Sequence, residues 1–190
     1  MTSSTKPRQE LDRAKNSVTH MASAQTLGAF EEHWKEFLRR LERSWNKLNA
    51  LHKSDPRWNA WQSPYVHMRR TDQLISYLVN ARGADEHSVQ EITAAEGTSV
   101  TINPATGSGM HIERMVFTRN SIHVQSKQPV KITFSPAKIR LLPVVNRGQT
   151  YPVPTEHKGD SLDPSNITAL AEAGLAFYYQ AVAAAEKHFI

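Results

Sequence analysis

The chain has 190 residues, which is near the usual size of one domain and long enough to bury a core without disulfides or structural metals. It contains no cysteine, so disulfides, thiolate metal sites and cysteine nucleophiles are excluded. The formal net charge is +5, which favours a polyanionic partner such as RNA or DNA over an acidic protein-binding surface.

Apolar residues are never gathered into a run of about 18, the length that spans a bilayer. Residues 1–10 are polar and lack the apolar stretch of a signal peptide. Together with the absence of cysteine, these features lead us to expect a cytoplasmic protein without a membrane partner.

Two helices are predicted at the start of the chain. Pro7 suits the first turn of a helix over residues 7–22. A second helix, over residues 26–52, shows apolar residues three and four positions apart on one face and charged residues on the other. Its apolar positions are Phe30, Trp34, Phe37, Leu38, Leu41, Trp45 and Leu48.

Residues 53–64 contain two prolines and no apolar period, which predicts a loop. We expect Trp58 and Trp61 to attach this loop to the core, and stacking of these rings on bases is the alternative. A third helix is predicted from residue 65 to about residue 92. Its apolar side carries Leu74, Leu78, Ala81, Val89 and Ile92.

From Gly97 onward the composition changes to β-branched alternation, broken by turn sequences. Short turns predict an antiparallel meander of four or five strands. The expected strands are residues 99–102, 110–117, 122–125, 130–134 and 139–145. Residues 146–161 are then predicted to be an extended connection. Asp163 and Pro164 predict the start of a final helix, whose small residues indicate close packing on another helix.

The predicted fold class is therefore α+β, with an antiparallel β meander inserted before the last helix. The N-terminal helices and the C-terminal helix form a bundle, and residues 1–190 make a single domain. Its helical part covers residues 7–96, its β segment residues 97–157, and the helix at residues 161–190 completes the helical part.

The third predicted helix carries the constellation Arg82-Gly83-Ala84-Asp85-Glu86-His87. At about 100° per residue, Arg82 falls on the margin of the apolar stripe and His87 on nearly the opposite side, facing water or a second molecule. Asp85 lies along the stripe and needs a partner, for which Arg82 is the obvious candidate. Arg82 and Glu86 stand four apart and can form an ordinary ion pair. Gly83 costs about 1 kcal/mol against alanine in a helix and marks a bend or a close approach.

An arginine followed by four residues and a histidine resembles the Arg-X(4–6)-His signature of the HEPN superfamily, whose members are commonly metal-independent endoribonucleases. Arg13 and His20 also match this spacing. Residues 69–87 further resemble bacterial proteins, without an assigned activity, that have a helix–motif–β-segment–helix layout. The chain departs from the superfamily at Gly83, where Asn, Asp or His is frequent, and at Val89, where many toxins have tyrosine. A β segment of this size is also not standard in the superfamily.

The resemblance implies a metal-independent endoribonuclease that acts on RNA as a homodimer, without a cofactor or a metal. His87 would be the general acid or base, and Arg82 would bind and stabilise the phosphate. Arg69, Arg70 and Asn80 would help to hold RNA, with Asp85 and Glu86 in support. One alternative is a non-catalytic binding or accessory protein, with a structural Arg82–Asp85 pair and a partner protein bound through the β segment. Another is a basic nucleic-acid-binding module.

Overall fold

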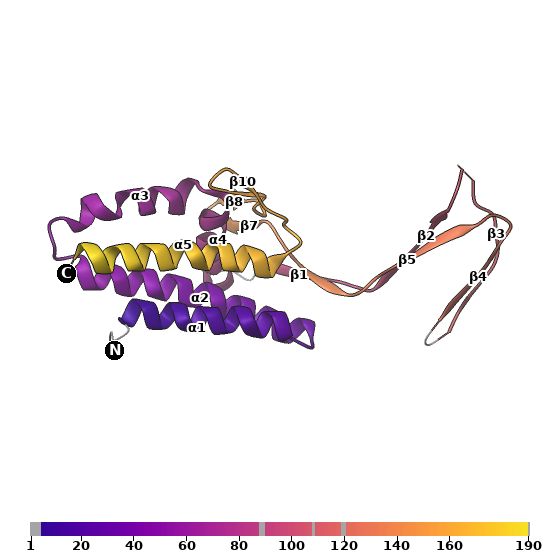
Figure 1. Ribbon diagram of the computed structural model, residues 1–190, viewed down its shortest axis with the longest axis horizontal. Coiled ribbons are helices and arrows are strands. Elements are labelled where there is room, and N and C mark those ends of the chain that lie inside the picture. The colour runs from indigo at the N-terminus through magenta and orange to yellow at the C-terminus, as the bar shows by residue number, and fades with distance from the viewer. Residues whose placement is uncertain (1–4, 88–89, 108, 119–120, 190) are drawn as a thin grey trace. The chain divides into compact units, whose positions relative to one another are not determined.

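The structure, a computed structural model, describes residues 5–87, 90–107, 109–118 and 121–189, apart from the side chain of His87. The predicted α+β class is confirmed, with an antiparallel strand meander before the final helix (Figure 1). The helices are α1 (Lys6–Ser23), α2 (Leu27–His52), α3 (Trp58–Thr71), α4 (Gln73–His87) and α5 (Ile167–His188). None of the described helices is long and apolar enough to cross a bilayer.

The chain divides into two compact units. The helical unit comprises Met1–Ala94 and Ile139–Ile190, and the strand unit comprises Ala95–Lys138. The expectation of a single domain over residues 1–190 stays a prediction.

In the helical unit, α1, α2 and α5 run side by side, and α4 packs against α2, α3 and α5 (Figure 1). The predicted apolar face of α2 is confirmed, because six of its seven positions are buried and Phe30 is half-buried. Gly174 of α5 faces Leu78 of α4 so closely that a methyl group in its place would overlap the leucine side chain. The predicted close packing of the last helix on a neighbour is thereby confirmed.

The predicted loop at residues 53–64 is wrong from Trp58 onward, where α3 begins with Pro64 inside it. Trp58, Trp61 and Tyr65 stand three and four residues apart and their rings pack one after another, with centroids 5.1 and 4.9 Å apart. This aromatic packing stabilises the helix although proline cannot donate a backbone hydrogen bond. Trp58 is buried, and its indole N–H donates to Asn49 Oδ1 over 2.8 Å, as expected for a ring that attaches the segment to the core.

The predicted single helix at residues 65–92 is two helices, because the backbone of Asp72 is extended between α3 and α4. The Asp72 carboxylate accepts the Ile75 N–H over 3.0 Å and so caps the new helix. The helix α4 ends at His87, Ile92 is not helical, and residues 88–89 lie outside the described part of the chain.

The last helix begins at Ile167, three residues after the predicted Pro164. Asn166 caps it by accepting the Ala169 N–H over 3.0 Å. Asp163 instead forms a local turn, since its carboxylate accepts the N–H and hydroxyl of Ser165.

Two hairpins of the helical unit occupy residues 144–161, where an extended connection is predicted over residues 146–161. The described residues form 10 strands in all. The strands of the two hairpins are β7 (Val144–Asn146), β8 (Gln149–Tyr151), β9 (Glu156–His157) and β10 (Asp160–Ser161). The turns between them contain Arg147-Gly148 and Lys158-Gly159, and all four of these residues have positive φ. The extended connection was therefore a wrong prediction.

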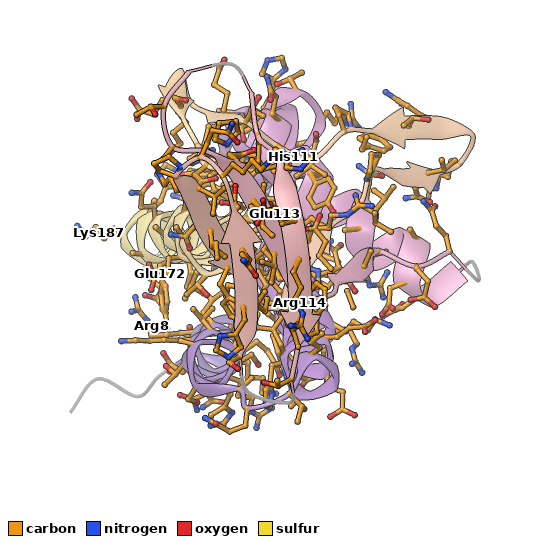
Figure 2. All side chains as sticks on the ribbon, turned by 90° about the vertical axis from the view of Figure 1, so that its right-hand side faces the viewer. Arg8, His111, Glu113, Arg114, Glu172 and Lys187 are labelled. Atoms are coloured by element: carbon orange, nitrogen blue, oxygen red, sulfur yellow. The ribbon has the colours of Figure 1, made fainter. Side chains whose placement is uncertain are left out.

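In the strand unit, β2 (Ser99–Pro104) pairs with β5 (Val130–Ser135), and β3 (Ile112–Phe117) pairs with β4 (Ile122–Ser126). Both pairs are antiparallel, and the β3–β4 hairpin lies between β2 and β5 in the chain. Val100 faces Phe134 and Ile102 faces Ile132 on one side of the first pair, whereas the other side is polar. No described residue of this unit is buried. Figure 2 labels three of its exposed residues, His111, Glu113 and Arg114. The remaining strands are β1 (Thr93–Glu96) and β6 (Lys138–Leu141), which pair with each other.

Candidate functional site

A cleft of about 460 Å³ opens in the helical unit between α2, α3, α4 and the β7–β8 hairpin. We call it the Arg82 cleft. Four arginines and one carboxylate are among its described lining residues, so it is strongly cationic. The lining is Glu42, Arg69, Arg70, Val79, Asn80, Arg82, Gly83, Asn146, Arg147, Gln149 and Tyr151. The structure thereby brings together four site residues predicted from the sequence, namely Arg69, Arg70, Asn80 and Arg82.

Arg82 lies on α4 with its side chain 30% exposed, and it forms an ion pair with Glu86 one helical turn further on. The expected structural pair between Arg82 and Asp85 is wrong. Asp85 instead pairs with Lys35 of α2 over 3.4 Å. In the described part of the chain, the buried Nε of Arg82 has no hydrogen-bond partner. The guanidinium is therefore oriented by Glu86 and still reaches the cleft.

Arg69 is mostly enclosed, with only 11% of its side chain exposed. One of its guanidinium nitrogens donates to Glu42 over 2.7 Å and another to the Tyr178 hydroxyl. The guanidinium carbon lies 4.8 Å from the ring centre of Trp45. Burial raises the pKa of Tyr178 to about 12, so this hydroxyl stays neutral at physiological pH. These contacts tie α3 to α2 and α5.

The unusual glycine of the motif is explained by a close approach. A Cβ at Gly83 would lie 2.6 Å from Asn146 Nδ2, which is shorter than real contacts of this kind. Asn146 Nδ2 donates to Asn80 Oδ1 over 2.9 Å, and Asn80 Nδ2 donates to the Ser76 carbonyl over 2.8 Å. This amide clasp, made by Asn80 and Asn146, holds the β7–β8 hairpin against α4 beside Gly83.

Sequence reasoning missed the side of the cleft that the β7–β8 hairpin supplies. Asn146, Arg147, Gln149 and Tyr151 all come from the end of the β segment and the predicted connection after it. One signal was present in the sequence. Gly148 follows an arginine between two short β-prone stretches, which is the pattern of a tight hairpin turn.

The side chain of His87 lies outside the described part of the chain, so its predicted catalytic role stays a prediction. Its position in the chain is the last residue of α4, five residues after Arg82. Glu86, predicted as a supporting residue, contacts Arg82, whereas Asp85 contacts Lys35. Among the described residues, no three His, Asp or Glu side chains lie close enough together to hold a metal ion.

The chain matches no protein-family model, no curated protein and no solved structure. What points to a function is therefore the chemistry of the Arg82 cleft and the resemblance of the motif that contributes Arg82 to it.

Proposed function

We propose that this protein is a metal-independent endoribonuclease of the HEPN type, which binds a phosphate of RNA in the Arg82 cleft. The observation that carries the proposal is that Arg70 and Arg82 line one cleft, with Arg82 being the arginine of the motif. Cationic side chains that converge on a cleft bind phosphate, and an arginine fork fits two phosphate oxygens at once.

The proposed reaction is attack of a ribose 2′-hydroxyl on the adjacent phosphate. The bond from the 2′ oxygen to phosphorus forms and the bond to the 5′ oxygen breaks, which leaves a cyclic phosphate and a free 5′-hydroxyl. The His87 imidazole takes the proton of the attacking hydroxyl while water protonates the leaving 5′ oxygen, or it gives a proton to the leaving oxygen while water takes the proton of the hydroxyl. Arg82 stabilises the charge that develops on the phosphate. Partial exposure of Arg82 suits this task, because its guanidinium does not have to leave the fold to meet a ligand.

Cleavage of an end-labelled RNA in the presence of EDTA tests the proposal. We expect His87→Ala to slow cleavage by about 10²- to 10⁴-fold, the usual contribution of a general acid or base. The matched control is His111→Ala, a histidine exposed on the strand unit, which should leave the rate unchanged. A wild-type protein that does not cut RNA, or equal rates for wild type and His87→Ala, would contradict the proposal.

A homodimer is part of the same proposal, because the resemblance implies that two protomers build the site. Light scattering in solution measures this directly. A strict monomer at the concentrations that cleave RNA would remove the composite site and leave a site made by one chain.

A second candidate function is a non-catalytic accessory protein that binds a partner protein through the strand unit. It is favoured by Phe117 and Phe134, which are 66% and 64% exposed on β3 and β5. Ile132 is 45% exposed and shares a face of β5 with Phe134, and contiguous exposed apolar side chains mark interaction surfaces. If this candidate function is correct, the protein does not cleave RNA. A purified partner should then bind Phe134→Ser less tightly than the wild-type protein, whereas Thr133→Ser, on the opposite face of β5, should not change the affinity.

A further inference from the structure

Two hairpin turns of the helical unit share one sequence pattern and one geometry. Arg147 and Gly148 have φ values of 52° and 78°, and Lys158 and Gly159 have values of 54° and 90°. Two central residues with positive φ define a type I′ turn, in which asparagine and glycine are preferred at the first of the two positions. Each turn therefore places a long cationic side chain where the backbone favours a short one.

The lysine of this pair already has contacts within the fold. Lys158 Nζ donates to Gln180 over 3.3 Å and lies 5.7 Å from the ring centre of Phe177. Its backbone N–H donates to Asp72 over 3.0 Å. These contacts account for the lysine in its turn, and Lys158 does not line the Arg82 cleft.

The arginine of the other turn has no internal contacts that explain its presence there. Arg147 is exposed, lines the Arg82 cleft, and makes no ion pair or side-chain hydrogen bond with any residue that the structure describes. Backbone strain that no internal contact explains is concentrated at functional sites. A cation without an internal partner, beside Arg70 and Arg82, adds to an anion site rather than to the stability of the fold.

The backbone that carries Arg147 is held by the pairing of β7 with β8 across the turn and by contacts of the residues before it. The preceding residue, Asn146, belongs to the amide clasp with Asn80. Further upstream, Gln90 accepts the Val145 N–H over 2.9 Å, and the Tyr77 hydroxyl donates to the Leu142 carbonyl over 2.8 Å. Only the side chain of Arg147 has to be ordered when a ligand binds, which lowers the entropic cost of binding.

We propose that Arg147 is a phosphate-binding residue of the Arg82 cleft and contacts the phosphodiester backbone of single-stranded RNA. The inference rests on the proposed function for the identity of the ligand as RNA. It extends the site from the helix that bears the motif to the turn between β7 and β8. Asn80, Asn146 and Gly83 are positioning residues in this arrangement, because they act through the turn.

The matched pair Arg147→Asn and Lys158→Asn tests this role. Each variant removes one cation from a type I′ turn and supplies the residue that the turn favours, so both should fold. The probe is a fluorescein-labelled oligouridylate of about 12 nucleotides, a length within single-strand site sizes, with 2′-O-methyl groups that prevent 2′ attack. Its binding is followed by anisotropy over a range of salt concentrations.

We expect Arg147→Asn to weaken binding about five-fold at 0.1 M salt and to reduce the salt slope by about 0.7, the values for loss of one phosphate contact on a single strand. Lys158→Asn should change the affinity by less than about two-fold. Unchanged binding by Arg147→Asn, or an equal loss in both variants, would overturn the role of Arg147.

Arg82→Ala in the same assay separates this inference from the proposed function. If Arg82→Ala weakens binding and Arg147→Asn does not, only the role of Arg147 fails. If the wild-type protein does not bind the oligouridylate, the proposed function fails and the role of Arg147 fails with it.

Discussion

Replacing Gly83 with alanine tests the packing that shapes the Arg82 cleft. Glycine in a helix costs about 1 kcal/mol against alanine, so the substitution should stabilise a helix with nothing beside it. In this protein the new methyl group would lie 2.6 Å from Asn146 Nδ2 and 3.2 Å from Asn146 Cγ. The asparagine side chain has to move, and it then loses its hydrogen bond to Asn80.

The two effects oppose each other, and their sizes decide the sign. A part-buried hydrogen-bonding group left without its partner costs about 1–3 kcal/mol, against the gain of about 1 kcal/mol in helix propensity. We therefore expect Gly83→Ala to destabilise the protein by about 1 kcal/mol. In an Asn146→Ala background the three atoms nearest to the new methyl group are gone, and Gly83→Ala should stabilise by about 1 kcal/mol.

Urea unfolding of the wild-type protein, the two single variants and the double variant gives the coupling energy of this cycle. A coupling of about 2 kcal/mol is expected from the values above. Stabilisation by about 1 kcal/mol in both backgrounds would refute the reasoning, because it would mean that Asn146 does not approach Gly83 closely in solution.

Two further predictions concern buried charges. Burial opposes ionisation of Glu10, but Lys47 and Arg40 outweigh it and lower the pKa of this carboxyl from 4.5 to about 2. Because the folded state then holds the proton less tightly than the unfolded state, the free energy of unfolding should fall as the pH decreases from 4.5 towards 2, and Glu10→Gln should flatten this fall in urea unfolding measured at each pH. Arg69→Lys should lower stability by about 1–2 kcal/mol, because lysine cannot bond Glu42, reach Tyr178 and stack on Trp45 together. RNA affinity per folded molecule should stay unchanged, and a loss of affinity without a loss of stability would assign Arg69 to the ligand.

The helical part of the fold was predictable where the spacing of apolar residues was regular. In α2, apolar spacing alone identified the buried face from Trp34 to Leu48. The boundary between α3 and α4 was not predictable in the same way, because the apolar pattern continues across Asp72 and only the cap shows the break. Pro64 led to the prediction of a loop where the chain is helical. The packing of Trp61 against Tyr65 outweighs the local effect of the proline.

The candidate site was predictable on α3 and on α4, the helix that bears the motif, but not on the β7–β8 hairpin. Arg82 and Asn80 could be selected from α4, but Asn146 lies 66 residues after Asn80, and no local pattern links the two. Gly83 was the residue of the motif that carried non-local information about the site. A glycine that a helix retains at a cost indicates that another segment needs the space of its missing side chain. A tight turn with positive φ can be that segment. Such a turn projects from its strands, so that a polar residue beside it can enter the space. In this chain that reasoning leads from Gly83 to Asn146, and from Asn146 to its neighbour Arg147, which the motif alone could not reveal.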